Sequence, residues 1–249
     1  MSVRSDSVSN AEIETPRGKV PAYVARPQQG GPWPGVVVLH DAFGMTTGAK
    51  RHVDGFASRG FIAASPSLFH DTPGGMMKCV RAAMREVAAR SGPMFDDIEA
   101  TRGWLARQPG CSGKIGVIGF CMSGGFAIAL APTGKYAASS VNYGTLPPDA
   151  ETFLNGACPM VASYGGKDRR LRGSAARLET ILTASKVPHD VKEYPEAGHG
   201  FMEDHVKSEL PWLFVKLAPL MDAGYHEAAA HDAHERVAAF FGKHLGAAT

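Results

Sequence analysis

The chain has 249 residues, and 44% of them are hydrophobic, enough for one large core, so we expect residues 1–249 to form a single domain. Its 26 basic and 24 acidic side chains leave a net charge of +2 without a block of like charge, which argues against a nucleic-acid partner. The polar start lacks the apolar core of a signal peptide, and no later apolar run is long enough to span a membrane. We therefore expect a cytoplasmic protein with no membrane partner.

The first predicted elements are a hairpin and a buried strand. Residues 11–16 and 20–26 alternate in polarity around Arg17-Gly18, which is typical of a β-hairpin. Residues 35–40 form an unbroken, largely β-branched run, which predicts a strand covered on both faces. This strand leads into His40-Asp41-Ala42-Phe43-Gly44, at the carboxyl end of a strand, where open α/β sheets bind ligands.

Helices and strands then alternate along the chain. Helices are predicted over residues 47–59, 76–90, 95–108, 174–184 and 226–245. Strands are predicted over residues 61–64, 115–118, 159–164 and 190–194, with a further strand ending at 141–144. This alternation predicts an α/β fold, with a mostly parallel central sheet and helices on both faces.

The stretch Gly119-Phe120-Cys121-Met122-Ser123-Gly124-Gly125 joins a predicted buried strand to a predicted buried helix. This pattern is typical of the nucleophile elbow of α/β-hydrolases, a strained turn that holds the nucleophile above the sheet. Small residues are expected at Gly119, Ser123 and Gly124, because larger side chains would crowd the bend. Cys121 occupies the nucleophile position. The alternative is a buried packing cysteine in a glycine-rich turn.

The chain has four cysteines, and no Cys-x-x-Cys pair suggests zinc or dithiol chemistry. In a reducing compartment all four should be thiols. Outside the elbow they are most simply small packing residues. These three are Cys79, Cys111 and Cys158.

A cysteine nucleophile needs a base, and the base needs a partner that fixes its tautomer. His199 and Asp168 suit these roles, since both lie in loops at predicted strand ends. The order Cys121, Asp168, His199 is nucleophile, acid, histidine, as in α/β-hydrolases. Alone, Asp168 could cap a helix and His199 could have no special task; together with the elbow they predict a catalytic triad.

An acyl-transfer site also needs hydrogen-bond donors for the oxyanion. The backbone N–H of Met122, at the start of the helix after the elbow, is one expected donor. The backbone N–H of Ala42, after the strand of residues 35–40, is the other.

These motifs resemble the dienelactone hydrolase family, cysteine hydrolases of the α/β-hydrolase fold also called carboxymethylenebutenolidase-like. The similarity covers about residues 11–245. It rests on the motifs at residues 40–44, 119–125, 165–168 and 198–201. The resemblance implies that Cys121 is the nucleophile, His199 the base and Asp168 the acid that orients it.

The resemblance also implies how substrate is bound. Family members that cleave dienelactone carry a glutamate where this chain has Asp41, and that glutamate contacts the resting thiol. Asp41 is therefore expected to contact the thiol through a side chain one methylene shorter, with Phe43 beside the substrate. Two arginines hold the substrate carboxylate in those enzymes, and the aligned positions here are Asp71 and Glu203.

Two acids in place of two arginines change the expected substrate. Losing two charge-assisted hydrogen bonds should weaken anion binding by about 3–6 kcal/mol, so we predict a preference for neutral esters or lactones over dienelactone. Three nearby cations offer another route to an anion, unless they only form a solvated loop. They are Arg169, Arg170 and Arg172.

Residues 203–225 are too long for an ordinary connection and carry many large apolar side chains. We expect a lid over the site, which would exclude water and shape an apolar pocket; an extra helix packed on the core is the alternative. The apolar side chains are Leu210, Trp212, Leu213, Phe214, Leu217, Leu220 and Met221.

Three histidines near the C-terminus, His226, His231 and His234, are interleaved with acids. Only His231 and His234 share a helix face, so a polar helix surface is expected rather than a metal site. We expect no metal, no cofactor and a monomer.

Taken together, the sequence predicts a carboxylic ester hydrolase that cleaves a small ester or lactone through an acyl-thioenzyme at Cys121. One alternative is a general carboxylesterase or thioesterase whose residues 203–225 bind acyl chains. The other is a non-catalytic module that binds a ligand or senses oxidants through Cys121.

Overall fold

The computed structural model describes residues 9–28, 30–71, 75–218 and 222–246. One eight-stranded sheet runs through this part of the chain, in the order β1-β2-β4-β3-β5-β6-β7-β8. The pairings from β4 across to β8 are parallel, and β2 and β1 are added through antiparallel pairings. The strands are β1 Ser9–Thr15, β2 Gly18–Ala25, β3 Trp33–Leu39, β4 Ile62–Pro66, β5 Cys111–Phe120, β6 Ala138–Asn142, β7 Met160–Gly165 and β8 His189–Tyr194.

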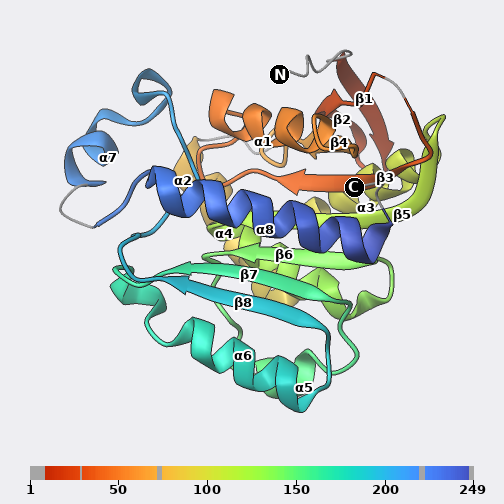
Figure 1. The fold of residues 1–249 in the computed structure, drawn as a ribbon. Helices are drawn as coiled ribbons and strands as arrows, with labels where there is room; N and C mark the ends of the chain where they lie inside the picture. The colour runs from red at the N-terminus through yellow and green to blue at the C-terminus, as the bar shows by residue number, and fades with distance from the viewer. Residues whose placement is uncertain (1–8, 29, 72–74, 219–221, 247–249) are drawn as a thin grey trace.

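Helices cover both faces of this sheet (Figure 1). They are α1 Thr47–Ala57, α2 Met76–Ala89, α3 Pro93–Ala106, α4 Met122–Leu130, α5 Ala150–Phe153, α6 Ser174–Ala184, α7 Trp212–Leu217 and α8 Glu227–Leu245. The predicted α/β fold with a mostly parallel sheet is thereby confirmed. Among the described helices, none has both the length and the hydropathy that crossing a membrane requires.

The side chains of β3 show how the two faces are filled. Val36 and Val38 belong to the core under α1 and α8, whereas Val37 and Leu39 belong to the core under α2 and α3. Successive residues of a strand point to opposite faces, so an unbroken apolar run is needed when both faces are covered. This is why residues 35–39 contain no polar side chain.

The parallel arrangement also positions the loops that carry the predicted site. Neighbouring strands β3, β5, β6, β7 and β8 all end at the same edge of the sheet. The segments that begin at His40, Cys121, Tyr143 and Gly166, and the loop that contains His199, follow these ends. Residues far apart in the sequence therefore meet above one edge, as open α/β sheets require of a binding site.

Candidate active site

Cys121 lies between the end of β5 and the start of α4, with φ 55° and ψ −116°. A non-glycine residue rarely adopts a positive φ, and such strain is characteristic of functional turns. The turn is closed so tightly that a Cβ on Gly119 would lie 2.1 Å from the Ser123 carbonyl oxygen. A Cβ on Gly124 would lie 2.6 Å from the Cα of Gly144. The glycines are required by close backbone contacts.

Ser123 is small, as the elbow requires, and it also ties the elbow to the sheet. Its buried hydroxyl accepts a hydrogen bond from the Phe120 N–H at 2.8 Å. The same oxygen lies 2.8 Å from the Leu39 carbonyl oxygen and 3.0 Å from that of Phe120, so its proton can be donated to either. The serine therefore fixes the elbow against the end of β3, a role that the sequence pattern did not reveal.

A chain of short polar contacts joins Cys121, His199 and Asp168. His199 Nε2 lies 3.0 Å from Cys121 Sγ, and His199 Nδ1 lies 2.5 Å from Asp168 Oδ2. Asp168 is buried, and its Oδ1 accepts a hydrogen bond from the Arg170 N–H at 3.1 Å. The three side chains come from the segments after β5, β7 and β8. The structure brings them into contact, with His199 between Cys121 and Asp168.

The contacts of His199 with Asp168 and Cys121 favour the protonated form of its imidazole. Burial disfavours the charged form of His199, but hydrogen bonds to Asp168 and Cys121 outweigh it and raise its pKa to about 9. Burial likewise opposes ionisation of Asp168, but its hydrogen bond to His199 lowers the pKa of this carboxyl below its ordinary value. His199 Nε2 lies 3.0 Å from Cys121 Sγ, within reach for proton transfer between the two side chains.

A cavity of about 230 Å³ opens beside Cys121 and His199. Met122 and Ala42, the two residues expected to donate to the oxyanion, also line it. Most of its remaining wall is apolar, with Val80, Met84 and Val87 of α2, Gly125 of α4 and Leu171 after Asp168. The side chains of α2 were missed from the sequence, because helical periodicity shows an apolar face but not which cavity it borders.

A family model, described as the dienelactone hydrolase family, matches residues 20–245. The chain belongs to the dienelactone hydrolase family. A carboxymethylenebutenolidase of Pseudomonas putida is 26% identical over 178 residues, covering 68% of this chain and 75% of its own. A Yersinia pestis protein, provisionally named a carboxymethylenebutenolidase, is 27% identical over 245 residues and covers 91% of this chain and 84% of its own.

Solved structures show the same fold. A crystal structure from Klebsiella pneumoniae, provisionally described as a dienelactone hydrolase, superposes with a TM-score of 0.75 at 23% identity, covering 96% of this chain and 100% of its own. Membership of the dienelactone hydrolase family makes this protein a hydrolase acting on ester or lactone substrates. The non-catalytic alternative is thereby set aside.

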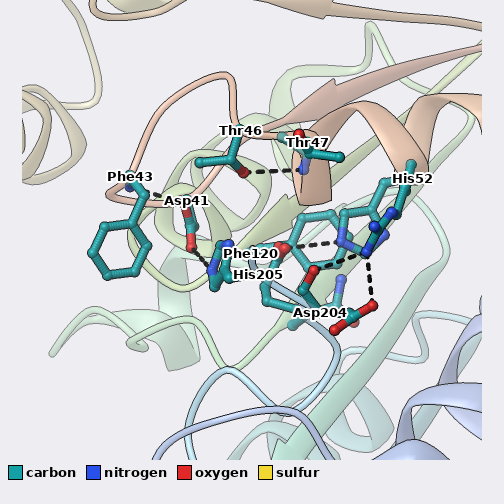
Figure 2. A network of polar contacts seen from close by, with 12 residues as sticks. Asp41, Phe43, Thr46, Thr47, His52, Phe120, Asp204 and His205 are labelled. Carbon is teal, nitrogen blue, oxygen red and sulfur yellow. Dashed lines mark hydrogen bonds and ion pairs between the residues drawn. The ribbon is translucent and has the colours of Figure 1, made fainter. Parts of the chain in front are cut away.

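Asp41 is placed differently from the family-based expectation. In this dienelactone hydrolase family member Asp41 is buried, and its Oδ1 accepts a hydrogen bond from the Phe43 N–H at 2.9 Å. Its Oδ2 lies 2.9 Å from His205 Nε2 (Figure 2). Both oxygens are thus engaged, and among the described residues the thiol's polar partner is His199 rather than Asp41. The Asp41 side chain, one methylene shorter than glutamate, therefore bonds to the backbone of its own loop and to His205.

The two acids expected at the arginine positions also lie away from the thiol cavity. Asp71 is 50% exposed and pairs with His70 Nε2 at 3.1 Å, with Arg17 at 4.0 Å, and is not among the described residues that line the cavity. Glu203 is buried, with Oε2 3.2 Å from His52 Nε2. Of the three candidate arginines, Arg170 alone is among the described residues lining the cavity.

The segment of residues 203–225 contains a short helix, α7, with Trp212 69% exposed. Phe214 packs edge-on against Phe43 at 4.7 Å between ring centroids, and Glu209 accepts hydrogen bonds from the Thr47 N–H and hydroxyl at 2.9 and 2.6 Å. None of its described residues lines the cavity of Cys121. Leu220 and Met221, also expected in the lid, lie outside the described residues.

Both ends of this segment meet at the loop of His199. Ala223 pairs with His199 as a parallel bridge, the Gly224 N–H donates to the His199 carbonyl at 2.9 Å, and the His226 N–H donates to the Phe201 carbonyl at 3.0 Å. The backbones approach so closely that a Cβ on Gly198 would lie 1.4 Å from the Asp222 carbonyl oxygen. The return of the segment therefore buttresses the loop that presents His199.

Proposed function

We propose that the protein hydrolyses a small neutral ester or lactone through an acyl-thioenzyme at Cys121. The observation that carries this proposal is the chain of contacts from Cys121 Sγ through His199 to Asp168 at the wall of an apolar cavity. Activated cysteine nucleophiles share this arrangement, in which a base contacts the thiol and an acid orients the base.

In the proposed reaction Cys121 Sγ attacks the carbonyl carbon, and the N–H groups of Met122 and Ala42 stabilise the oxyanion. Each such donor typically contributes about 10²–10³-fold to the rate. His199 gives its proton to the leaving alkoxide, and the C–O bond breaks as the thioester remains. Water, deprotonated by His199, then attacks the thioester carbonyl, and the C–S bond breaks to release the acid and restore the Cys121 sulfur beside a protonated His199, while Asp168 keeps the imidazole oriented.

This mechanism predicts a pH dependence set by His199. Its pKa is raised to about 9, so the proton needed by the leaving group is present below that pH and lost as pH rises through it. The value of kcat/KM should therefore fall above about pH 9. In Asp168→Asn a partner that raises this pKa is lost, so the alkaline fall should move to lower pH, measured as a pH–rate profile on one ester. An alkaline limb that does not move in Asp168→Asn would contradict the assignment.

Neutral substrates are proposed because the described wall of the cavity is mostly apolar, and its one arginine, Arg170, is 59% exposed and already lies 3.6 Å from Asp168 Oδ1. Burying an unpaired carboxylate there is costly. The test compares matched esters and lactones that differ only by a carboxylate, with wild type, Cys121→Ala and Arg170→Gln assayed in parallel. We expect Cys121-dependent turnover, with kcat/KM about tenfold or more higher for the neutral members.

The outcomes separate the alternatives. Hydrolysis retained in Cys121→Ala would refute the acyl-thioenzyme. A preference for the carboxylate-bearing substrates that disappears in Arg170→Gln would show that Arg170 binds the substrate carboxylate. Dienelactone would then be the leading substrate. A steady rise of kcat/KM with acyl-chain length would favour the general carboxylesterase or thioesterase.

We also propose that residues 203–225 act as a lid. The support is the packing of Phe214 on Phe43, which follows Ala42 in the loop after β3. Movement of this segment would reach the proposed oxyanion donor through that contact.

A further inference from the structure

A second polar cluster lies beside the proposed active site and has no part in the triad. It consists of Asp41 from the loop after β3, and of Glu203 and His205 from the segment that follows the His199 loop. Asp41 and Glu203 are 5% and 4% exposed. One ligand atom of each residue can be chosen so that all three lie within 4.8 Å of one another. Figure 2 shows Asp41 and His205 turned toward each other within this network.

The polar atoms of this cluster are incompletely satisfied. Both carboxylate oxygens of Glu203 are buried without a hydrogen-bond partner, as is His205 Nδ1. His52 Nε2 lies 3.2 Å from Glu203 Oε2, within ion-pair distance, but it too has no hydrogen bond. Buried carboxylates are normally paired, hydrogen-bonded or bound to a metal, so Glu203 lacks what its position requires.

The cluster also holds two buried acids without a strong cation. The ion pairs of the described residues join Asp41 to His205 and Glu203 to His52, and neither acid to a lysine or arginine. Both buried acids therefore have only imidazole partners in these ion pairs, so a bound cation would supply the positive charge that neither acid receives from a lysine or arginine.

We propose that Asp41, Glu203 and His205 bind a divalent transition-metal ion, for which zinc is the best match. Two carboxylate oxygens and one imidazole nitrogen suit zinc, cobalt and manganese better than soft or purely oxygen-seeking ions. Rotation of these side chains would bring the ligand atoms to about 2.0–2.2 Å from one ion. His52, stacked on Phe120 at 4.2 Å, would hold the second oxygen of Glu203 in place.

A cavity lies close to this cluster. It has a volume of about 230 Å³, lies between α1 and α8 and is lined by Gly48, His52 and Asp204. A Cβ on Gly48, which lines this cavity, would lie 3.3 Å from Glu203 Oε2 and 3.4 Å from His205 Nδ1, so only the backbone of this glycine separates the cavity from these two atoms on that side. An ion bound there would tie the loop that carries Ala42 to the segment that follows His199.

The test uses the full-length protein, freed of metal by dialysis against a chelator and titrated with Zn²⁺ and with Co²⁺. We expect one ion per chain, a higher melting temperature with Zn²⁺, and a Co²⁺ spectrum without a sulfur-to-cobalt charge-transfer band. Glu203→Gln should weaken binding by about 100-fold or more. The matched control is Glu209→Gln, an exposed acid of the same segment that accepts hydrogen bonds from Thr47 and does not line the cavity between α1 and α8; it should bind as wild type does.

Glu203→Gln keeps the shape of the side chain and removes a buried charge, so we expect it to fold; His205→Gln is the second variant should it not. The proposal is overturned if the wild type binds no ion at stoichiometric concentration, or if both variants bind as tightly as wild type. It is also overturned if binding is lost in Cys121→Ala, since the ion would then sit on the triad. Ester hydrolysis is not the readout, so these results are independent of the proposed reaction.

Discussion

Replacing Cys121 by alanine should lower ester hydrolysis by about 10⁴-fold or more, because the proposed covalent step uses Cys121 Sγ as its nucleophile. Alanine removes only Sγ and leaves the positive φ of the elbow unchanged, so the variant should keep its fold. The measurements are kcat/KM on a neutral ester and mass spectrometry of quenched turnover mixtures. An added acyl mass should be found on wild type and be absent from Cys121→Ala.

Cys158 provides the matched control for this experiment. Burial raises the pKa of its thiol to about 12, so it should not be a thiolate near neutral pH. Cys158→Ala should therefore retain both turnover and acyl labelling. If the acyl group were found on Cys158 in the Cys121→Ala protein, or if both variants were equally active, the nucleophile would have been misassigned.

Gly119→Ala should destabilise the protein by about 3 kcal/mol or more, because the added methyl would meet backbone atoms that cannot rotate away. Its Cβ would lie 2.1 Å from the Ser123 carbonyl oxygen and 2.9 Å from the Gly124 nitrogen. Relief requires opening the elbow, which would also move Cys121 away from His199. Urea denaturation followed by circular dichroism measures the loss of stability.

Gly242 in α8 is the matched control, since it is buried but a Cβ there would meet nothing within 4 Å. Gly242→Ala should stabilise the protein by about 0.5–1 kcal/mol, the usual cost of glycine in a helix interior. Equal losses of stability in both variants would mean that the tight packing of the elbow does not determine the effect.

The sequence predicted the sheet and the elbow because both depend on local pattern. The β-branched run of residues 35–39 has to be buried on both faces, and the structure places it in the interior strand β3. The helix predicted over residues 174–184 is α6 with the same bounds. The close contact of Gly119 in the elbow is with Ser123, only four positions away, so the need for a small residue at position 119 could be interpreted directly from the sequence.

The surroundings of the site could not be predicted, because they depend on contacts between distant segments. Asp41 and His205 are 164 residues apart in sequence, and no spacing pattern links them. The aligned acids Asp71 and Glu203 were expected at the substrate, yet each pairs with a histidine elsewhere. His234 was expected on a polar helix surface, but its Nε2 lies 3.2 Å from His52 Nδ1, and burial lowers its pKa to about 3.

Residues 203–225 return to the loop of His199 close to the point at which they leave it. Because the excursion leaves and rejoins the fold at nearly the same point, at His199 and Ala223, its length can change without separating the strands on which the triad is built. The entropic cost of closing a loop grows only slowly with its length. A change in the length of this excursion would therefore leave in place the loop that presents His199.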